Sequence, residues 1–137
     1  MGRTESYVVA LLERLLGPVE RGKRFDWARG DASPRTGRRA MLPFDAVWEV
    51  RKLIVEIDED QHREVTPLFD KPDRMTVSGV HRGEQRRAYD ARKRSAAKAR
   101  GYQLIAIEWS RRRKPQQADL DELRALLVAE GVAELVG

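Results

Sequence analysis

The chain has 137 residues, 41% of them hydrophobic and 36% charged, which is enough apolar material for a single domain over residues 1–137. It carries 27 Lys and Arg residues against 22 Asp and Glu residues, a net charge of +5, and the segregation of these charges along the chain favours a polyanionic partner. Cysteine is absent, which fits the cytoplasm and excludes thiolate metal ligands and cysteine nucleophiles, and no apolar run approaches the roughly 20 residues of a membrane span.

Residues 4–16 predict an amphipathic helix that covers one face of a sheet. Its apolar positions recur at helical spacing: Val8, Leu11, Leu12, Leu15 and Leu16. The Gly17-Pro18 pair predicts its end. We expect this helix to have a core role rather than a functional one.

A short strand over residues 24–29 and a loop over residues 30–39 follow. The strand alternates around Phe25 and Trp27. The loop contains turn-forming residues and three arginines, which either lie in solvent or contact phosphates. These arginines are Arg35, Arg38 and Arg39.

Residues 41–50 predict a second strand, which carries acids among apolar residues. Alternation places Leu42, Phe44, Ala46, Trp48 and Val50 on one face and Asp45, Val47 and Glu49 on the other. An acid on an otherwise apolar strand is unusual, so Asp45 is a candidate site residue. Arg51-Lys52 predicts a tight connection to the next strand.

Residues 53–62 begin as a buried strand and end as an acidic cluster closed by a histidine. Four carboxylates within five residues, straight after an apolar run, are costly unless a cation compensates them. The period of two projects Glu56 and Asp58 to the same face. If this strand pairs antiparallel with the preceding one, Asp45 approaches the same patch, and three carboxylates there would suit Mg²⁺ or Mn²⁺.

The rest of the chain adds a basic helix, a strand and a final helix. Residues 63–80 are irregular, as in a disordered segment or a substrate flap. Residues 81–100 predict a helix too basic for a merely solvated face, ended by Gly101. Residues 102–109 predict a central strand, because both of its faces are apolar. Residues 119–136 predict an amphipathic helix.

Basic residues in these last segments are further candidates for phosphate contacts. On the basic helix they are Arg82, Arg86, Arg87, Lys93 and Arg94, and after the last strand they are Arg111, Arg112 and Arg113.

The order of these elements and motifs resembles the PD-(D/E)XK nuclease superfamily. Pro43-Phe44-Asp45 stands for the P-x-D of that family, and Glu56-Ile57-Asp58 stands for its (D/E)-x-K. Glu56, Asp58 and His62 are also similar to the E-x-D-x-x-x-H pattern of the branch related to very-short-patch repair endonucleases.

The basic helix extends the resemblance to that branch, whose following helix carries D-x-x-R and then a glycine. Asp90-Ala91-Arg92-Lys93 and Gly101 are similar, with Lys93 in the place of the arginine. Gln85-Arg86-Arg87-Ala88-Tyr89 also matches a short Q-x-x-x-Y motif of an exonuclease-like branch.

The resemblance implies a restriction-endonuclease-like fold, a three-layer α/β/α core with a central mixed sheet of about four strands flanked by helices. It also implies hydrolysis of DNA phosphodiester bonds with Mg²⁺ as the cofactor, or Mn²⁺ in its place. Asp45, Glu56 and Asp58 would be metal ligands. Gln61 would orient water or phosphate, and His62 would act as a general base or donor.

The sequence departs from the family at Asp58, where a lysine usually stands. Either His62 does the work of that lysine, or Lys52 or another basic residue reaches in, or the site is impaired. A structural alternative places Glu56 and Asp58 in salt bridges to Lys52 or to arginines of the basic helix.

Three functional hypotheses therefore stay open: a metal-dependent DNA endonuclease, a non-catalytic nucleic-acid-binding module that keeps the fold, and a Holliday-junction resolvase. DNA is the expected partner. A homodimer and a separate target-recognition protein are also open as partners, because neither a zinc finger nor a helix-turn-helix is evident in the sequence.

Overall fold

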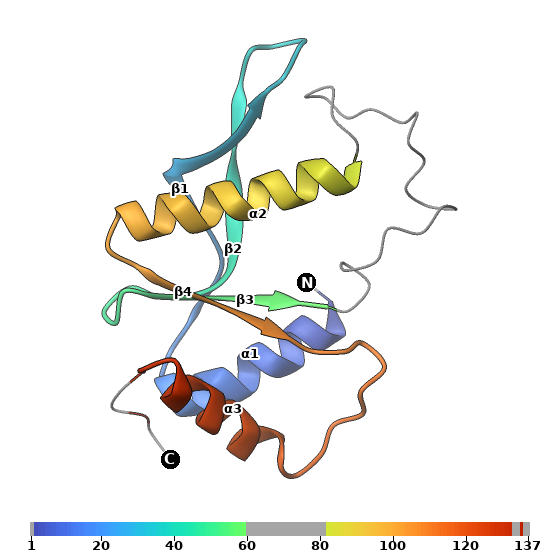
Figure 1. Ribbon diagram of the computed structural model, residues 1–137, viewed down its shortest axis with the longest axis vertical. Coiled ribbons are helices and arrows are strands. Elements are labelled where there is room, and N and C mark those ends of the chain that lie inside the picture. Colours follow the sequence, from blue (N-terminus) through green and yellow to red (C-terminus); the bar gives the residue numbers. More distant parts are fainter. Residues whose placement is uncertain (1, 60–81, 133–134, 136–137) are drawn as a thin grey trace.

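The structure, a computed structural model, describes residues 2–59, 82–132 and 135, and of residues 82 and 83 it describes the backbone. The helices are α1 (Arg3–Leu16), α2 (Arg82–Ala99) and α3 (Asp119–Ala129), and the strands are β1 (Glu20–Ala32), β2 (Arg39–Trp48), β3 (Leu53–Asp58) and β4 (Gln103–Glu108). None of these helices has the length and apolar character needed to cross a membrane. The predicted α/β class with a four-stranded mixed sheet is confirmed (Figure 1).

The sheet has the strand order β1-β2-β3-β4. β2 pairs antiparallel with both β1 and β3, as predicted for β2 and β3, whereas β3 and β4 are parallel. Parallel neighbours need a crossover connection, and α2 is the helix in that connection. The prediction that the strand at residues 102–109 is central is wrong, because β4 lies at an edge of the sheet. Only one of its two apolar faces is buried, with Ile105 and Ile107, whereas Leu104 and Ala106 on the other face line a cleft.

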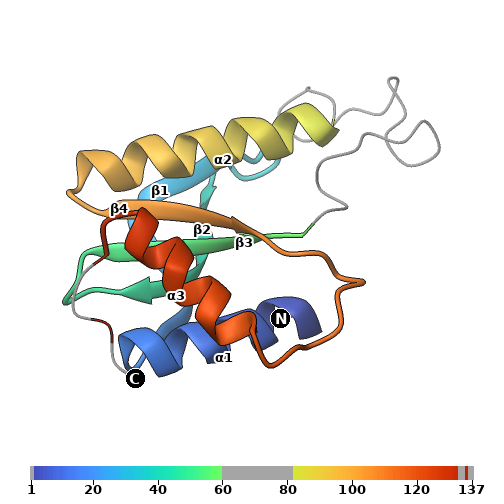
Figure 2. The same cartoon turned by 60° about the horizontal axis from the view of Figure 1, so that its bottom comes forward.

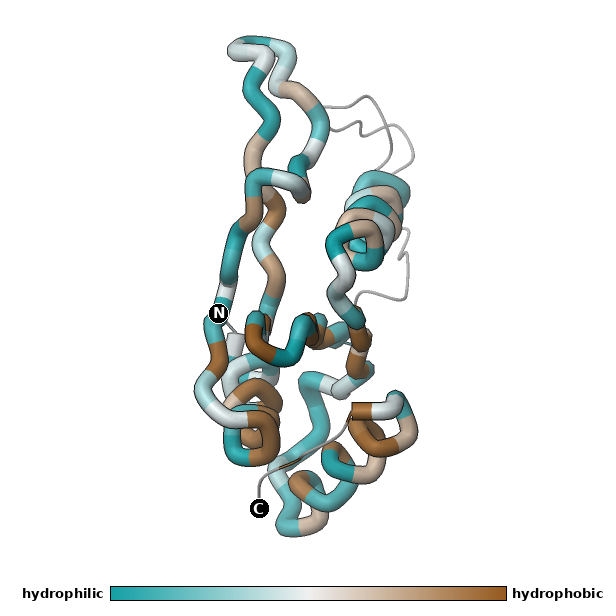
Figure 3. The backbone as a smooth tube through the Cα atoms, turned by 90° about the vertical axis from the view of Figure 1, so that its left-hand side faces the viewer, coloured by the Kyte–Doolittle hydropathy of each residue, from teal (hydrophilic) through white to brown (hydrophobic). Residues whose placement is uncertain are grey.

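Helices cover both faces of the sheet, which makes three layers. Figure 2 shows α2 on one side and α1 with α3 on the other. The α1 and α3 side holds the larger core, with fifteen buried residues, and the α2 side holds six. Figure 3 shows the same asymmetry, because hydrophobic segments gather around α1 and α3.

The β1–β2 hairpin is longer than predicted. β1 runs for 13 residues, so the predicted strand over residues 24–29 is its middle, and the predicted loop shrinks to residues 33–38. The pairing with β2 continues beyond two irregularities to Ala32, opposite Arg39. Figure 1 shows this hairpin extending past α2 at the top of the view.

The predicted faces of the second strand are correct only in part. Ala46 and Trp48 pack into the larger core as predicted, but Phe44 packs with Val47 on the α2 side. Phe44 lies beyond Ala46, where the regular β2–β3 ladder stops, although its pairing with β1 stays in register. Val50 lies after the end of β2 and is fully exposed.

The helix ends agree with the turn chemistry of the sequence. Gly17 follows α1 with φ of 92°, and Gly101 follows the end of α2 with φ of 81°, a backbone region that favours glycine. α3 ends at Ala129, earlier than the predicted residue 136. The predicted irregular segment 63–80 lies outside the described residues.

Candidate functional site

The side chains of Asp45 and Glu56 join β2 and β3 at the end of their ladder, and we call this pair of residues the clasp. The last regular backbone pair is Ala46 with Val55. At the next position, side-chain carboxylates accept the hydrogen bonds of the backbone N–H groups. The backbone N–H of Asp45 donates to Glu56 Oε2 at 2.8 Å, and the backbone N–H of Ile57 donates to Asp45 Oδ2 at 2.8 Å. Each carboxylate is thereby fixed through one oxygen, and its other oxygen is left for a different partner.

Lys93 of α2 supplies a cation to this clasp. Its Nζ forms an ion pair with Glu56 Oε1 and lies 4.9 Å from the centre of the Phe44 ring. The side chains of Lys93 and Glu56 are only 13% and 18% exposed. Because water is largely excluded, the charges interact more strongly than they would on the surface. α2 is held over this position by the buried Ala97, one helical turn further on.

The carboxylates at the clasp outnumber the cations beside them. Burial first, and then the neighbouring Asp45 carboxylate, raise the pKa of Glu56 to about 7, although Lys93 opposes this shift. Burial and Asp45 also raise the pKa of Glu5, which hydrogen-bonds to Asp45 from α1. Carboxylates that are crowded together in this way favour a proton or a cation between them.

These groups line one cleft, with a volume of about 220 Å³. Its walls combine the β2–β3 clasp, the start of α1 and one face of α2. Six acidic and three basic side chains contribute to it: Glu5, Asp45, Glu56, Asp58, Glu59 and Asp90, with Arg86, Lys93 and Arg94. The cleft therefore has an acidic excess of three in a chain whose net charge is +5.

The structure brings three of the five predicted catalytic residues to this cleft. Asp45, Glu56 and Asp58 all line it. Gln61 and His62 lie outside the described residues. Within residues 2–59 and 82–132, no group of three or more His, Asp and Glu side chains is arranged to hold a metal ion. The metal-ligand role of all three thus stays a prediction, and of the three Asp45 and Glu56 are in direct contact with each other.

Glu5 and Lys93 lie beside Asp45 and Glu56, although neither was predicted from the sequence to be part of the metal site. Glu5 lies on the helix that we expected to have only a core role, and Lys93 was expected to bind phosphate. Glu5 precedes Val8 and Val9 at helical spacing, so an acid on the buried face of α1 was the available signal. For Lys93, the signal was its place in the D-x-x-R-like motif.

The other predicted phosphate contacts fall into three groups: arginines that line the cleft, exposed arginines elsewhere, and arginines of the β1–β2 hairpin. Arg86 and Arg94 line the cleft, whereas Arg87 and Arg112 are exposed away from it. Arg111 is paired with Glu59 at 3.0 Å, with 59% of its own side chain exposed. Arg82 is described by its backbone alone, so its predicted phosphate contact stays a prediction.

The hairpin arginines are the third group. Arg35 and Arg38 are exposed in the turn. Arg39 donates through Nε to the carbonyl of Gly30 at 2.8 Å, so it also braces the hairpin.

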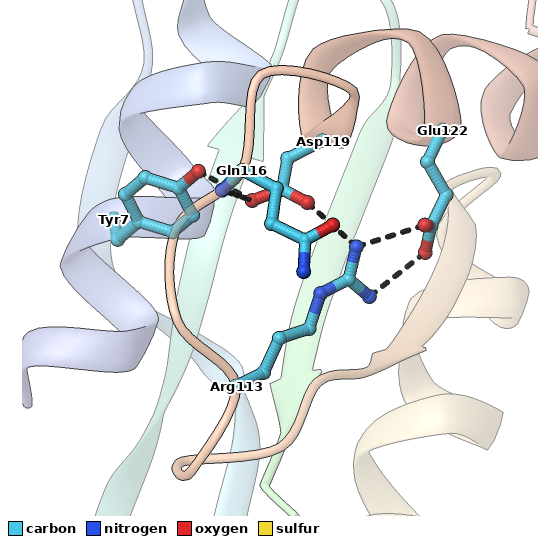
Figure 4. Close-up of polar contacts among 5 residues, drawn as sticks. All are labelled: Tyr7, Arg113, Gln116, Asp119 and Glu122. Carbon is cyan, nitrogen blue, oxygen red and sulfur yellow. Dashed lines mark hydrogen bonds and ion pairs between the residues drawn. The ribbon is translucent and has the colours of Figure 1, made fainter.

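Arg113, another predicted nucleic-acid contact, forms ion pairs within the protein, and its contact with nucleic acid stays a prediction. Figure 4 shows its guanidinium bridging Asp119 and Glu122, at 2.6 and 2.8 Å, and it stacks 3.8 Å from the centre of the Trp109 ring. Asp119 is 1% exposed and also accepts from the Tyr7 hydroxyl at 2.6 Å. These contacts distinguish Arg113, which is partly buried, from its exposed neighbours Arg111 and Arg112.

The Q-x-x-x-Y match is structural as well. The Tyr89 hydroxyl accepts from the backbone N–H of Asp31 at 3.0 Å, and Gln85 donates to it at 3.4 Å. The bond to Asp31 attaches α2 to β1, and the bond from Gln85 lies within α2. Comparison of the chain with protein-family models, with curated proteins and with solved structures gave no match, so the case for a function is made by the cleft itself.

Proposed function

We propose that the chain is a divalent-metal-dependent DNA endonuclease that works in the cleft between β3 and α2. The observation that carries the proposal is the clasp of Asp45 and Glu56 with Lys93 beside it. Two fixed carboxylates and a desolvated ammonium group meet there, in a cleft with an acidic excess on a basic protein. The order of the motifs that resemble the PD-(D/E)XK nucleases supports the same assignment.

The donor chemistry of the clasp suits a hard cation such as Mg²⁺. Mg²⁺ is commonly held by one or two carboxylates, with water and substrate phosphate completing its shell. Asp45 and Glu56 would hold it through the oxygens that are not bonded to backbone N–H groups. Glu5 and Asp58 line the same cleft and are the further candidate ligands.

A divalent cation bound there would lower the pKa of a water molecule and compensate the charge that develops on the phosphate. Lys93 would donate a hydrogen bond to the attacking water or to a phosphate oxygen, the work that the usual lysine of the family does. It would approach from α2 rather than from the strand position of Asp58. Arg86 and Arg94 would contact neighbouring phosphates along the cleft.

The predicted roles of Gln61 and His62 remain part of this proposal through the resemblance alone. Gln61 would orient the water or the phosphate, and His62 would act as a general base or donor.

A non-catalytic nucleic-acid-binding module is the second candidate. The observation that favours it is that both carboxylates already have partners within the protein. Lys93 forms an ion pair with Glu56 Oε1, and Glu5 hydrogen-bonds to Asp45. This ion pair is similar to the structural alternative, although its cation is Lys93 and not Lys52 or an arginine of the basic helix. On this hypothesis the carboxylates fasten α2 to the sheet, and the exposed arginines still bind phosphate.

Cleavage of supercoiled plasmid DNA with Mg²⁺ or Mn²⁺ separates the two candidates. The variants are Asp45→Asn and Glu56→Gln, because the amide oxygens can still accept the two backbone N–H bonds. Asp121→Asn is the matched control, an exposed acid on α3. We expect both clasp variants to lose about 10²-fold or more in rate, and the control to keep its activity.

Two further readouts complete the test. Isothermal titration of Mn²⁺ should show binding that Asp45→Asn weakens and Asp121→Asn does not. Cutting that survives both clasp substitutions would remove the proposed site, and intact plasmid with every metal would favour the non-catalytic module. Comparison of a linear duplex with a four-way junction tests the resolvase hypothesis.

A further inference from the structure

The β1–β2 hairpin is a two-stranded ribbon that the proposed cleft does not use. It extends past α2 (Figure 1), and much of its length is hydrophilic in Figure 3. Residues 34–40 are all exposed. Its outer part, residues 29–39, holds four arginines and one aspartate.

Arginine side chains brace the two strands of the ribbon. Arg29 donates to the carbonyl of Arg39 at 2.9 Å, and Arg39 donates to the carbonyl of Gly30 at 2.8 Å. Arg24 donates to the carbonyl of Met41 in the same manner. These bonds cross the region where the register of β1 and β2 shifts. The ribbon is therefore stiffened where its regular ladder is interrupted.

α2 contacts the start of the outer part of the ribbon and holds it in position relative to the cleft. Arg92 pairs with Asp31 at 2.9 Å, and the Tyr89 hydroxyl accepts from the Asp31 backbone N–H at 3.0 Å. Gly30 lets the Tyr89 ring approach closely, since a Cβ there would lie 3.0 Å from the hydroxyl oxygen. The one aspartate of the outer ribbon is thus neutralised by α2.

The tip of the ribbon is ordered and cationic. Ser33 donates its backbone N–H to the carbonyl of Arg38 at 2.8 Å, and the N–H of Gly37 donates to the carbonyl of Ser33 at 2.8 Å. Gly37 has φ of 72°, which favours glycine. Among the described residues, the side chains of Arg35 and Arg38 form no ion pair, so their charges are not neutralised by an acidic side chain of that part of the chain.

We propose that this ribbon is a duplex-binding arm, with its tip in the major groove and Arg35 and Arg38 on base edges or adjacent phosphates. The major groove of B-DNA, about 12 Å wide, admits a two-stranded ribbon, whereas the minor groove is about 6 Å wide. Arginine donates bidentately to guanine O6 and N7 on the major-groove edge. The inference deepens the proposed function, on which its DNA partner rests, by naming the duplex as the substrate form.

The first test measures the binding of a mixed-sequence duplex by fluorescence anisotropy in EDTA, so that cleavage does not contribute. The double substitution Arg35→Ala/Arg38→Ala removes the tip charges. Its control is Arg3→Ala/Arg14→Ala, which removes two exposed arginines from α1 and changes the net charge equally. We expect the tip variant to lose about tenfold or more in affinity and the control to change by less than about twofold.

The second test determines whether the tip contacts the major groove of the duplex. Methylation of guanine N7 marks the major-groove edge, and we expect it to weaken duplex binding by the wild type and to have little further effect on the tip variant. Equal losses for tip and control variants, or insensitivity to N7 methylation, would overturn the assignment. So would tighter binding of single-stranded DNA or RNA than of the duplex.

Cleavage and binding can fail separately in these tests. A wild-type protein that binds the duplex through its tip but leaves plasmid uncut with Mg²⁺ would contradict the proposed function and leave the arm in place. A protein that cuts plasmid and binds the duplex equally well without its tip arginines would contradict the arm alone. Circular dichroism of each variant establishes that the fold is intact.

Discussion

The two faces of the sheet share the same strands but differ in chemistry. On one face of β3, Leu53, Val55 and Ile57 pack with α1 and α3 into the larger core. On the other face, Ile54 is buried, but the next position is Glu56, which meets Lys93. Alternation along six residues of strand thus assigns one face to apolar packing and the other to charge.

This difference shows how a small domain can carry a costly cluster of carboxylates. Apolar burial is the main favourable contribution to folding, and here most of it lies on the α1 and α3 side. The α2 side contributes fewer buried residues and holds the cleft. We therefore expect substitutions on one face to change stability and substitutions on the other to change function.

The largest expected effect is on the α1 side. Leu12 is fully buried, so Leu12→Ala should lower the free energy of unfolding by about 2–5 kcal/mol, through lost burial and a cavity. Val128→Ala is the control, since Val128 is 60% exposed, and it should change stability by less than about 0.5 kcal/mol. Urea denaturation measures both. Similar midpoints for the two variants would mean that this face does not dominate stability.

Lys93 gives the corresponding prediction on the α2 side. Lys93→Met keeps the aliphatic length and removes the ammonium group, so we expect DNA cleavage to slow by about 10²-fold or more. Lys98→Met, an exposed lysine on the same helix, is the control. Single-turnover kinetics should show the loss in the rate of cutting rather than in duplex affinity. A rate equal to that of the Lys98 variant would assign Lys93 to structure only.

The division of β3 into two faces could be predicted from the sequence because a strand has a strict period of two. The same rule placed Asp45 beside Glu56, and the structure confirms that contact. It failed for Phe44, which lies beyond the last regular β2–β3 pair, next to the point where the side chains of Asp45 and Glu56 accept the backbone bonds. The exception therefore lies beside the candidate site.

Other features depend on contacts between distant segments, which a single sequence does not reveal. The outer part of β1 contacts Tyr89 at Gly30, which is 59 residues earlier in the chain. The edge position of β4 depends on the order of strands, which an apolar pattern does not encode. Arg113 has a local sequence context similar to that of its neighbours, and its contacts with Asp119, Glu122 and Trp109 distinguish it.

Arg113 provides an intermediate effect on the α1 and α3 side, where polar groups are rare. Arg113→Met should destabilise the fold by about 1–3 kcal/mol at neutral pH, because it removes a charged partner from the buried Asp119. Arg112→Met, an exposed neighbour, should have little effect. Thermal unfolding of both variants and the wild type measures the difference.

The same substitution makes a prediction about pH. Burial alone would raise the pKa of Asp119, but hydrogen bonds from Tyr7, the Gln116 backbone and Arg113 hold it below its ordinary value. Arg113 likewise lowers the pKa of Glu122. Lowered folded-state pKa values stabilise the fold above the ordinary carboxyl range and cease to do so as pH falls through them. The gap in stability between wild type and Arg113→Met should therefore narrow below about pH 4, and a gap that widens there would contradict this account.

The smallest expected effect is at the attachment of the ribbon to α2. Tyr89→Phe removes the acceptor of the Asp31 backbone N–H and should lower the free energy of unfolding by about 0.5–1.5 kcal/mol. Tyr102→Phe is the matched control, because it removes the same atom from a bond to Glu49 at a different place in the fold. Amide hydrogen exchange distinguishes them: Tyr89→Phe should speed exchange at Asp31, and Tyr102→Phe should leave it unchanged. If exchange at Asp31 stays slow in both, the arm is held by Arg92 and by its own strands, and the α2 face contributes less to its position than the bonds of Tyr89 indicate.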